Sequence, residues 1–129
     1  MVAATEATIT GNVSIQGAAG FSIGAGSRIA GNLLIQNVAS ASATNQICGS
    51  SVAGNVTVST NAVPISIGSG TLSCLGNTFG ANVDITFNTA PVQVFDNFVQ
   101  KNLVCSSNTS ITGASNLAQR RKSGLCSGF

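Results

Sequence analysis

Short alternations of apolar and polar residues recur along the chain and define its organisation. In each one an asparagine is followed by three residues, and the side chains of these three alternate between inward and outward. Asn55-Val56-Thr57-Val58 is an example. A period-2 alternation of this length predicts a half-buried strand of three or four residues. The five copies begin at Asn12, Asn32, Asn55, Asn82 and Asn102.

The distance between successive copies predicts the architecture. The five asparagines are 20, 23, 27 and 20 residues apart. A repeat of that length is too short to be a domain, so we expect each repeat to be one coil of a solenoid. A second alternation follows in each coil, as in Phe21-Ser22-Ile23, where Phe21 and Ile23 are expected inside and Ser22 outside.

Two coils are longer than the others and carry insertions. Residues 38–46 are rich in Ala, Ser, Thr and Asn, so we expect a loop that bulges from the second coil before Ile47 rejoins the stack. Residues 68–75 extend the third coil and contain Cys74. Proline cannot donate a ladder hydrogen bond, so Pro64 and Pro91 are expected at the first residue of a strand.

Asparagine is expected at the corners between strands. It tolerates the left-handed backbone that a sharp bend needs, and its amide can bond to the equivalent residue of the next coil. The five asparagines of the repeat form one corner, and a third corner is glycine-rich. The residues expected at the second corner are Asn37, Asn61, Asn88 and Asn108, with Gly17 in the first coil.

These observations predict an all-β fold: a single right-handed parallel β-helix, three-sided, with about five coils of 20–27 residues. The uneven coil length favours the right-handed form, because left-handed hexapeptide solenoids keep a stricter repeat of roughly 18 residues. The 129 residues form one domain. Residues 1–8 are expected to be an N-terminal cap or edge, 9–116 the coils, and 117–129 a polar C-terminal cap.

Four cysteines are present, and their spacing predicts their pairing. Cys48 and Cys74 are 26 residues apart, and Cys105 and Cys126 are 21 apart, so each pair is separated by about one coil. Residues one coil apart stack at about 4.8 Å, which suits a disulfide. We therefore expect disulfides Cys48–Cys74 and Cys105–Cys126; four buried free thiols are the alternative. Disulfides would place the chain outside the cytoplasm.

One set of phrases is shared with known proteins: Gly54-Asn55, Asn88-Thr89-Ala90-Pro91, Asn102-Leu103-Val104-Cys105 and Cys126. In these residues the chain resembles a group of secreted bacterial β-helix proteins of unknown function. It implies a right-handed parallel β-helix and secretion, and it implies no activity.

Charge is scarce, and this limits the chemistry that the chain can perform. Only 6% of the residues are charged, against about a quarter in an average domain, and there is no histidine. Acid/base catalysis and calcium binding both need clustered carboxylates, and the chain has only Glu6, Asp84 and Asp96. We therefore expect no catalytic residue, metal or cofactor. The Arg120-Arg121-Lys122 run is more typical of a solvated cap than of a nucleic-acid site.

The outward residues bear on possible ligands. Ice-binding β-helices use flat rows of Thr or Ser, but the outward residues expected here are mixed. The first strand presents Ser14, Leu34, Thr57, Asp84 and Val104, and the second Ser22, Ser66 and Gln93. Asn12, Asn55 and Asn108 also match glycosylation sequons, although a corner role explains each of them.

Self-association is the function that we expect from the sequence. A solenoid has open strand edges, and the surface lacks the charges that keep proteins apart. We expect a secreted, non-catalytic structural protein whose copies join, possibly end to end, into a filament or surface layer. An ice- or carbohydrate-binding module is the alternative. Neither nucleic acid nor a membrane span is expected.

Overall fold

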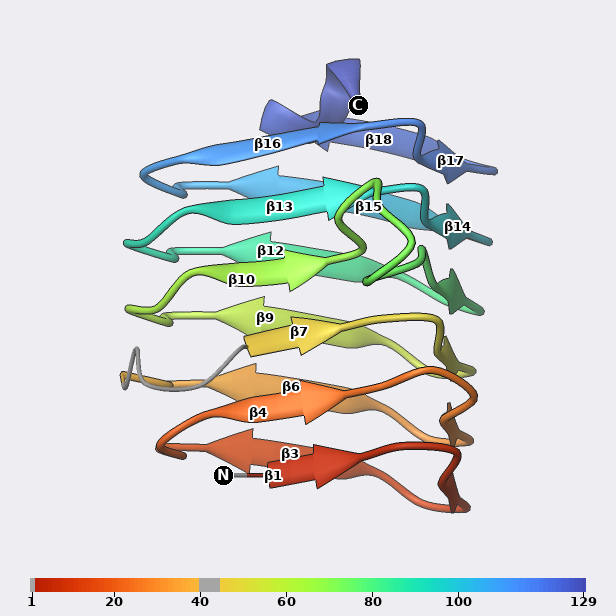
Figure 1. The fold of residues 1–129 in the computed structure, drawn as a ribbon. Helices are drawn as coiled ribbons and strands as arrows, with labels where there is room; N and C mark the ends of the chain where they lie inside the picture. The colour runs from red at the N-terminus through yellow and green to blue at the C-terminus, as the bar shows by residue number, and fades with distance from the viewer. Residues whose placement is uncertain (1, 40–44) are drawn as a thin grey trace.

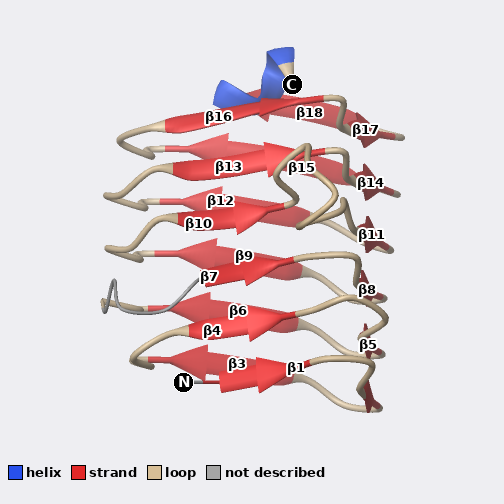
Figure 2. Ribbon diagram, in the orientation of Figure 1, coloured by secondary structure: helices blue, strands red, loops and turns tan. Residues whose placement is uncertain are grey.

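The computed structural model describes residues 2–39 and 45–129, which wind into a solenoid of about six turns (Figures 1 and 2). Each turn contributes one short strand to each of three parallel sheets. In Figure 1 the chain runs along the near sheet, turns through short strands at the right and returns along the far sheet while it rises from the N-terminus, which is a right-handed path. The predicted all-β, three-sided, right-handed parallel β-helix is confirmed.

Each of the three sheets contains six strands among the described residues. Sheet A contains β1 (Val2–Ala4), β4 (Phe21–Ile23), β7 (Asn45–Ile47), β10 (Ile65–Ile67), β13 (Val92–Phe95) and β16 (Ile111–Ala114). Sheet B contains β2 (Thr8–Ile9), β5 (Arg28–Ile29), β8 (Ser51–Val52), β11 (Thr78–Phe79), β14 (Phe98–Val99) and β17 (Leu117–Ala118). Sheet C contains β3 (Val13–Gln16), β6 (Leu33–Gln36), β9 (Val56–Ser59), β12 (Val83–Thr86), β15 (Asn102–Ser106) and β18 (Arg121–Gly124). A 3₁₀ helix, η1 (Leu125–Gly128), follows β18.

The core is a set of stacked apolar rows inside the three sheets. In sheet C, Leu33 pairs with Val56 and Val56 pairs with Val83, and all three side chains are buried. Phe21 and Ile23 are buried in β4, while Ser22 between them is half-buried on the outer side, as predicted. Each inward side chain therefore contacts its counterparts in the adjacent turns, which removes apolar surface from water without a long strand.

The two ends of the chain take part in the sheets. The segment expected as an N-terminal cap or edge contains β1, which pairs with β4 as the first strand of sheet A. The segment 117–129 is not a separate cap: β17 pairs with β14 and β18 pairs with β15, and η1 then packs on the last turn. This adds a turn to the five predicted from the asparagines. The polar strand β18 has no inward-outward apolar alternation, so its backbone pairing leaves no pattern in the sequence.

The first insertion is shorter than predicted. Asn45 and Gln46, which were expected in the loop 38–46, lie in β7. Asn45 faces inward at 4% exposure and its Oδ1 accepts a hydrogen bond from the N–H of Phe21 at 3.0 Å. A polar residue at an inward position broke the alternation, and this is why the sequence did not reveal the strand. Residues 40–44 lie outside the described part of the chain.

Asparagine ladders run along the three corners. At the exposed first corner, the N–H of Asn32 donates to Oδ1 of Asn12 at 2.8 Å, and the pattern continues along the repeat. At the buried second corner, the N–H of Val38 donates to Asn61, that of Asn61 to Asn88, and that of Asn88 to Asn108. The predicted role of the side-chain amides in linking coils is confirmed at both corners.

The third corner holds a ladder that the sequence prediction missed. The N–H of Ser50 donates to Asn77, which donates to Asn97, which donates to Asn116. This corner was expected to be glycine-rich, and a glycine does stand directly before the ladder position in three consecutive turns, at Gly26, Gly49 and Gly76, but not in the turns of Asn97 and Asn116. Asn77, Asn97 and Asn116 are 20 and 19 residues apart, a spacing that would have revealed them.

The prediction that the corner asparagines adopt the left-handed backbone is wrong for the ladders. The second-corner bend is made one residue earlier, where φ lies between 56° and 63°. Asn37 belongs to this bending row, not to the ladder, and Val38 takes the ladder position beside Asn61. The ladder asparagines therefore serve as hydrogen-bonding groups and the preceding residues as bends. The bending row contains Gly17, Asn37, Thr60, Phe87 and Ser107.

Both predicted disulfides are present. Cys48–Cys74 joins the residue after β7 to the second insertion across a Cα–Cα distance of 4.8 Å. Cys105–Cys126 joins β15 to η1 across 5.3 Å. Each bridge therefore connects adjacent turns, and the second fastens η1 to the last turns of the stack.

Candidate interaction surfaces

The three carboxylates do not form one site. Asp84 lies on the outer side of β12, in register between Thr57 and Val104. Glu6 and Asp96 occupy equivalent positions at the third corner, both at positive φ. They are four turns apart, which corresponds to roughly 19 Å along the stack at the usual strand spacing. The structure therefore keeps the acidic groups separate.

The basic run near the C-terminus belongs to the last turn. Arg121 and Lys122 lie in β18, paired with Asn102 and Leu103. The ammonium group of Lys122 donates to the carbonyl of Asn116 at 3.1 Å, the last asparagine of the third ladder. Lys122 thus binds a backbone acceptor at the end of that ladder.

The outward rows of sheets A and C are mixed, as predicted. In sheet C, Ser14 is followed by Leu34, Thr57, Asp84 and Val104. In sheet A, Ser22, Gln46, Ser66, Gln93 and Thr112 are in register. Apolar and amide side chains interrupt the hydroxyls, so neither row repeats the same hydroxyl from turn to turn.

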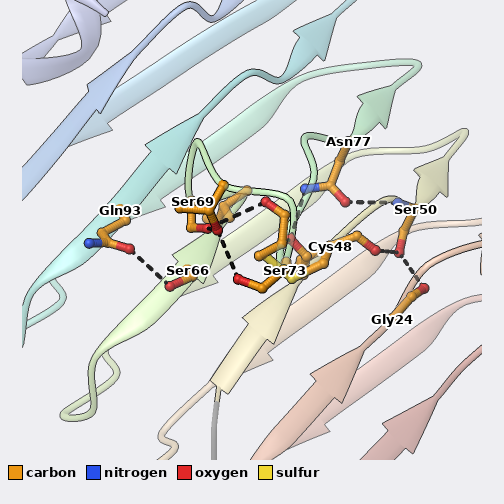
Figure 3. Close-up of a disulfide and its surroundings, with 12 residues drawn as sticks. Gly24, Cys48, Ser50, Ser66, Ser69, Ser73, Asn77 and Gln93 are labelled. Carbon is orange, nitrogen blue, oxygen red and sulfur yellow. Dashed lines mark hydrogen bonds between the residues drawn. A yellow bond between two sulfur atoms is a disulfide. The ribbon is translucent and has the colours of Figure 1, made fainter.

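A braced loop, residues 68–75, projects between β10 and β11. Gly68 and Gly70 adopt φ of 69° and 74°, which bend the chain away from the coil. The N–H of Ser69 donates to the carbonyl of Cys74 at 3.0 Å, and the Cys74 N–H donates to Thr71 at 3.3 Å. The bridge to Cys48 then fixes the loop to the previous turn (Figure 3). The result is a small closed turn held at both ends.

The hydroxyl groups of the loop reinforce this turn. Oγ of Ser69 lies 2.7 Å from Oγ1 of Thr71, which lies 2.8 Å from Oγ of Ser73. Figure 3 shows Ser69 and Ser73 joined through this chain beside the disulfide. The loop also packs on the end of β13, since a Cβ built on Gly70 would lie 3.4 Å from the ring of Phe95. The loop is therefore supported by hydrogen bonds within itself and by its contact with Phe95 of the next turn.

The braced loop presents apolar side chains to solvent. Leu72 is 92% exposed and Leu75 is 52% exposed. Leucine is among the residue types most often found buried. Here the closed turn and the Cys48–Cys74 bridge hold the segment that carries both leucines. The sequence prediction treated this segment as an insertion in the third coil and did not identify its apolar tip.

A hollow of about 500 Å³ lies on the outer side of sheet B, over β2, β5, β8 and β11. The outward residues of these strands are Thr8, Arg28, Ser51 and Thr78, in register along the stack. Two positions after the outward residue, three successive turns carry a small residue, and the space that these leave forms the hollow. The small residues are Ala30, Ala53 and Gly80, and the longer Gln100 stands at the same position in the next turn.

The hollow was not predicted, although its signal is present in the sequence. The small residues Ala30, Ala53 and Gly80 are spaced by 23 and 27 residues, like the asparagines two positions later. The sequence prediction did not consider what the third side of each coil presents to solvent.

Comparisons with models of known protein families, with curated proteins and with solved structures give no significant match to this chain. Within the described residues, no helix has the length and apolar character that a membrane span requires.

Proposed function

We propose that this chain is a non-catalytic extracellular structural protein whose copies associate through the side faces of the solenoid into a filament or surface layer. The observation that carries this proposal is Leu72, 92% exposed on a loop that the Cys48–Cys74 bridge holds in place. A side chain on a rigid support loses little conformational entropy when a partner covers it. Most of the free energy of burying it is therefore retained on association.

The composition of the surface supports association. Three acidic and five basic residues are spread over 129 positions. Mutual repulsion between copies is therefore weak, and a net charge of +2 does little to keep them apart. Other exposed apolar side chains, such as Leu117 at 57% and Leu125 at 55%, extend the same character over the molecule.

The two bridges support the extracellular assignment. Both join adjacent turns, and disulfides persist in oxidising compartments such as the extracellular space. A module whose coils are tied together in this way suits a load-bearing or surface-covering role, because the bridges oppose local unwinding.

Sedimentation velocity on the oxidised protein over a wide concentration range tests the proposal. Copies that associate through side faces give species whose mass grows with concentration, and electron microscopy of the same samples shows extended or sheet-like particles. Monomers at every concentration would reject it.

Carbohydrate binding is a second candidate, favoured by the polar side chains along the hollow. Hydroxyls of Thr8, Ser51 and Thr78, the guanidinium of Arg28 and the amide of Gln100 line one side face. These are groups that hydrogen-bond sugar hydroxyls. Calorimetric titration with soluble neutral and acidic polysaccharides tests this function: a protein that remains monomeric and binds a polysaccharide would replace self-association as the conclusion.

A further inference from the structure

We infer that the hollow over β2, β5, β8 and β11 receives the Leu72 loop of a second copy of the chain. This inference rests on the proposed self-association and assigns its two contacting surfaces. The loop is the segment 68–75, and the hollow is the depression of about 500 Å³ floored by Ala30, Ala53 and Gly80.

The two surfaces complement each other in shape and polarity. The loop is a protrusion with Leu72 and Leu75 exposed and carries no charged residue. The floor of the hollow is apolar, because it is formed by the methyl groups of Ala30 and Ala53 and by Gly80, which has no side chain. Placing the leucines there removes apolar surface from water on both copies. The hydroxyls of Ser69, Thr71 and Ser73 in the same loop hydrogen-bond to one another, so they need no partner in the hollow.

The charges at the two surfaces are also complementary. Arg28 is the one charged residue among the described residues that line the hollow. Asp96 lies at the base of the loop, where a Cβ built on Gly76 would be 2.9 Å from the Cβ of Asp96. Both side chains are exposed. With the loop seated in the hollow, Asp96 of one copy and Arg28 of the other provide an ion pair that fixes the orientation.

The contact is heterologous, because the loop and the hollow are different surfaces of the chain. A heterologous contact leaves one free loop and one free hollow on every pair of copies, so it repeats into a ring or an open chain. This property links one local contact to the proposed filament or layer.

A mixing experiment with two variants tests the inference. Leu72→Asp puts a charge at the tip of the loop but leaves the hollow intact. Ala53→Trp fills the hollow but leaves the loop intact, and Ala53 is exposed, so the core is not disturbed. Each variant alone is expected to associate about tenfold to a hundredfold more weakly than the wild type, the loss expected for one leucine side chain.

The equimolar mixture of the two variants tests the pairing of loop and hollow directly. The loop of the Ala53→Trp chain enters the hollow of the Leu72→Asp chain, and growth then stops, so sedimentation shows a 1:1 complex and nothing larger. Phe87→Asp and Ala62→Trp are matched controls, because both positions are exposed and lie away from the two surfaces; both should associate like the wild type. Circular dichroism confirms folding, and Leu72→Ser and Ala53→Gln replace any variant that fails to fold.

The failures of the two proposals are distinguishable. If the wild type associates and both single variants associate equally well, the loop and the hollow are not the contact, while the proposed function stands. Folded variants that each lose association but give no 1:1 complex when mixed also overturn the pairing. A wild type that is monomeric throughout overturns the proposed function itself, and this inference with it.

Discussion

The buried asparagine ladder at the second corner gives the sharpest prediction of stability. Asn88 is fully buried, and its Oδ1 accepts hydrogen bonds from the N–H of Asn61 at 3.1 Å and from Nδ2 of Asn61 at 3.0 Å. Its own Nδ2 donates to Asn108 at 2.9 Å and to the carbonyl of Val58 at 3.0 Å. The substitution Asn88→Ala removes all four of these bonds at once.

The loss of unfolding free energy can be estimated from the groups that lose their hydrogen-bond partner. In Asn88→Ala, two donors of Asn61 face a site that lacks an acceptor, and Asn61 is itself fully buried. A buried donor without a partner costs roughly 1–3 kcal/mol, so the two together give about 2–6 kcal/mol. Domains of this size unfold with about 5–15 kcal/mol. The variant should therefore lose a large part of its stability.

Asn55→Ala is the matched control. Asn55 makes the same kind of contact, since its Oδ1 accepts from the N–H of Asn82 at 3.1 Å, but this corner is exposed to solvent. Water can replace the lost acceptor, so the expected loss is about 1 kcal/mol. Urea denaturation followed by far-ultraviolet circular dichroism measures both variants. Equal destabilisation of the two would refute the reasoning that burial gives the ladder its strength.

Three further predictions follow from the bridges, the loop and the charges. Replacing both cysteines of the Cys48–Cys74 bridge by Ala should cost about 3–4 kcal/mol by the loop-entropy estimate for a closed loop of this length and should also weaken association, as seen by denaturation and sedimentation. Gly68→Ala should destabilise by at least about 2 kcal/mol more than Gly17→Ala in thermal unfolding, because both positions have positive φ but only at Gly68 would a Cβ meet a backbone carbonyl. Arg28→Asp should weaken association, and adding Asp96→Arg in the same chain should restore it; if the double variant associates no better than Arg28→Asp, the ion pair is not part of the contact.

The repeat made the architecture predictable from sequence. Short alternations spaced by one coil predicted parallel stacking, and the spacing of the cysteines predicted both bridges, because residues one coil apart lie close together in any solenoid. The inward positions of Phe21, Ile23 and Ile15 followed from the alternation alone. These features depend on periodicity, which can be read directly from the sequence.

The features that were missed depend on exceptions to the pattern. The strand β7 begins with the inward Asn45, and β18 is held by backbone bonds under polar side chains, so neither shows an apolar alternation. The left-handed bends were assigned to ladder asparagines on propensity, yet Thr60 and Phe87 adopt that backbone. In these residues the stacking of neighbouring turns overrides local preference.

The two candidate surfaces were beyond sequence reasoning for a different reason. The exposure of Leu72 depends on a loop closed by hydrogen bonds and a disulfide, and a neutral loop sequence does not show which side chain its tip presents. The hollow arises because Ala30, Ala53 and Gly80 fall in register, which follows only once the strands of sheet B are aligned.

Photo-crosslinking from position 72 tests the central claim most directly. A photoreactive phenylalanine analogue in place of Leu72 is irradiated in the oxidised protein at a concentration where copies associate, and the crosslinked peptides are identified by mass spectrometry. The proposed contact predicts intermolecular crosslinks to the hollow, at or next to Ala30 and Ala53. Crosslinks confined to sheets A or C, or no intermolecular product at all, would contradict it.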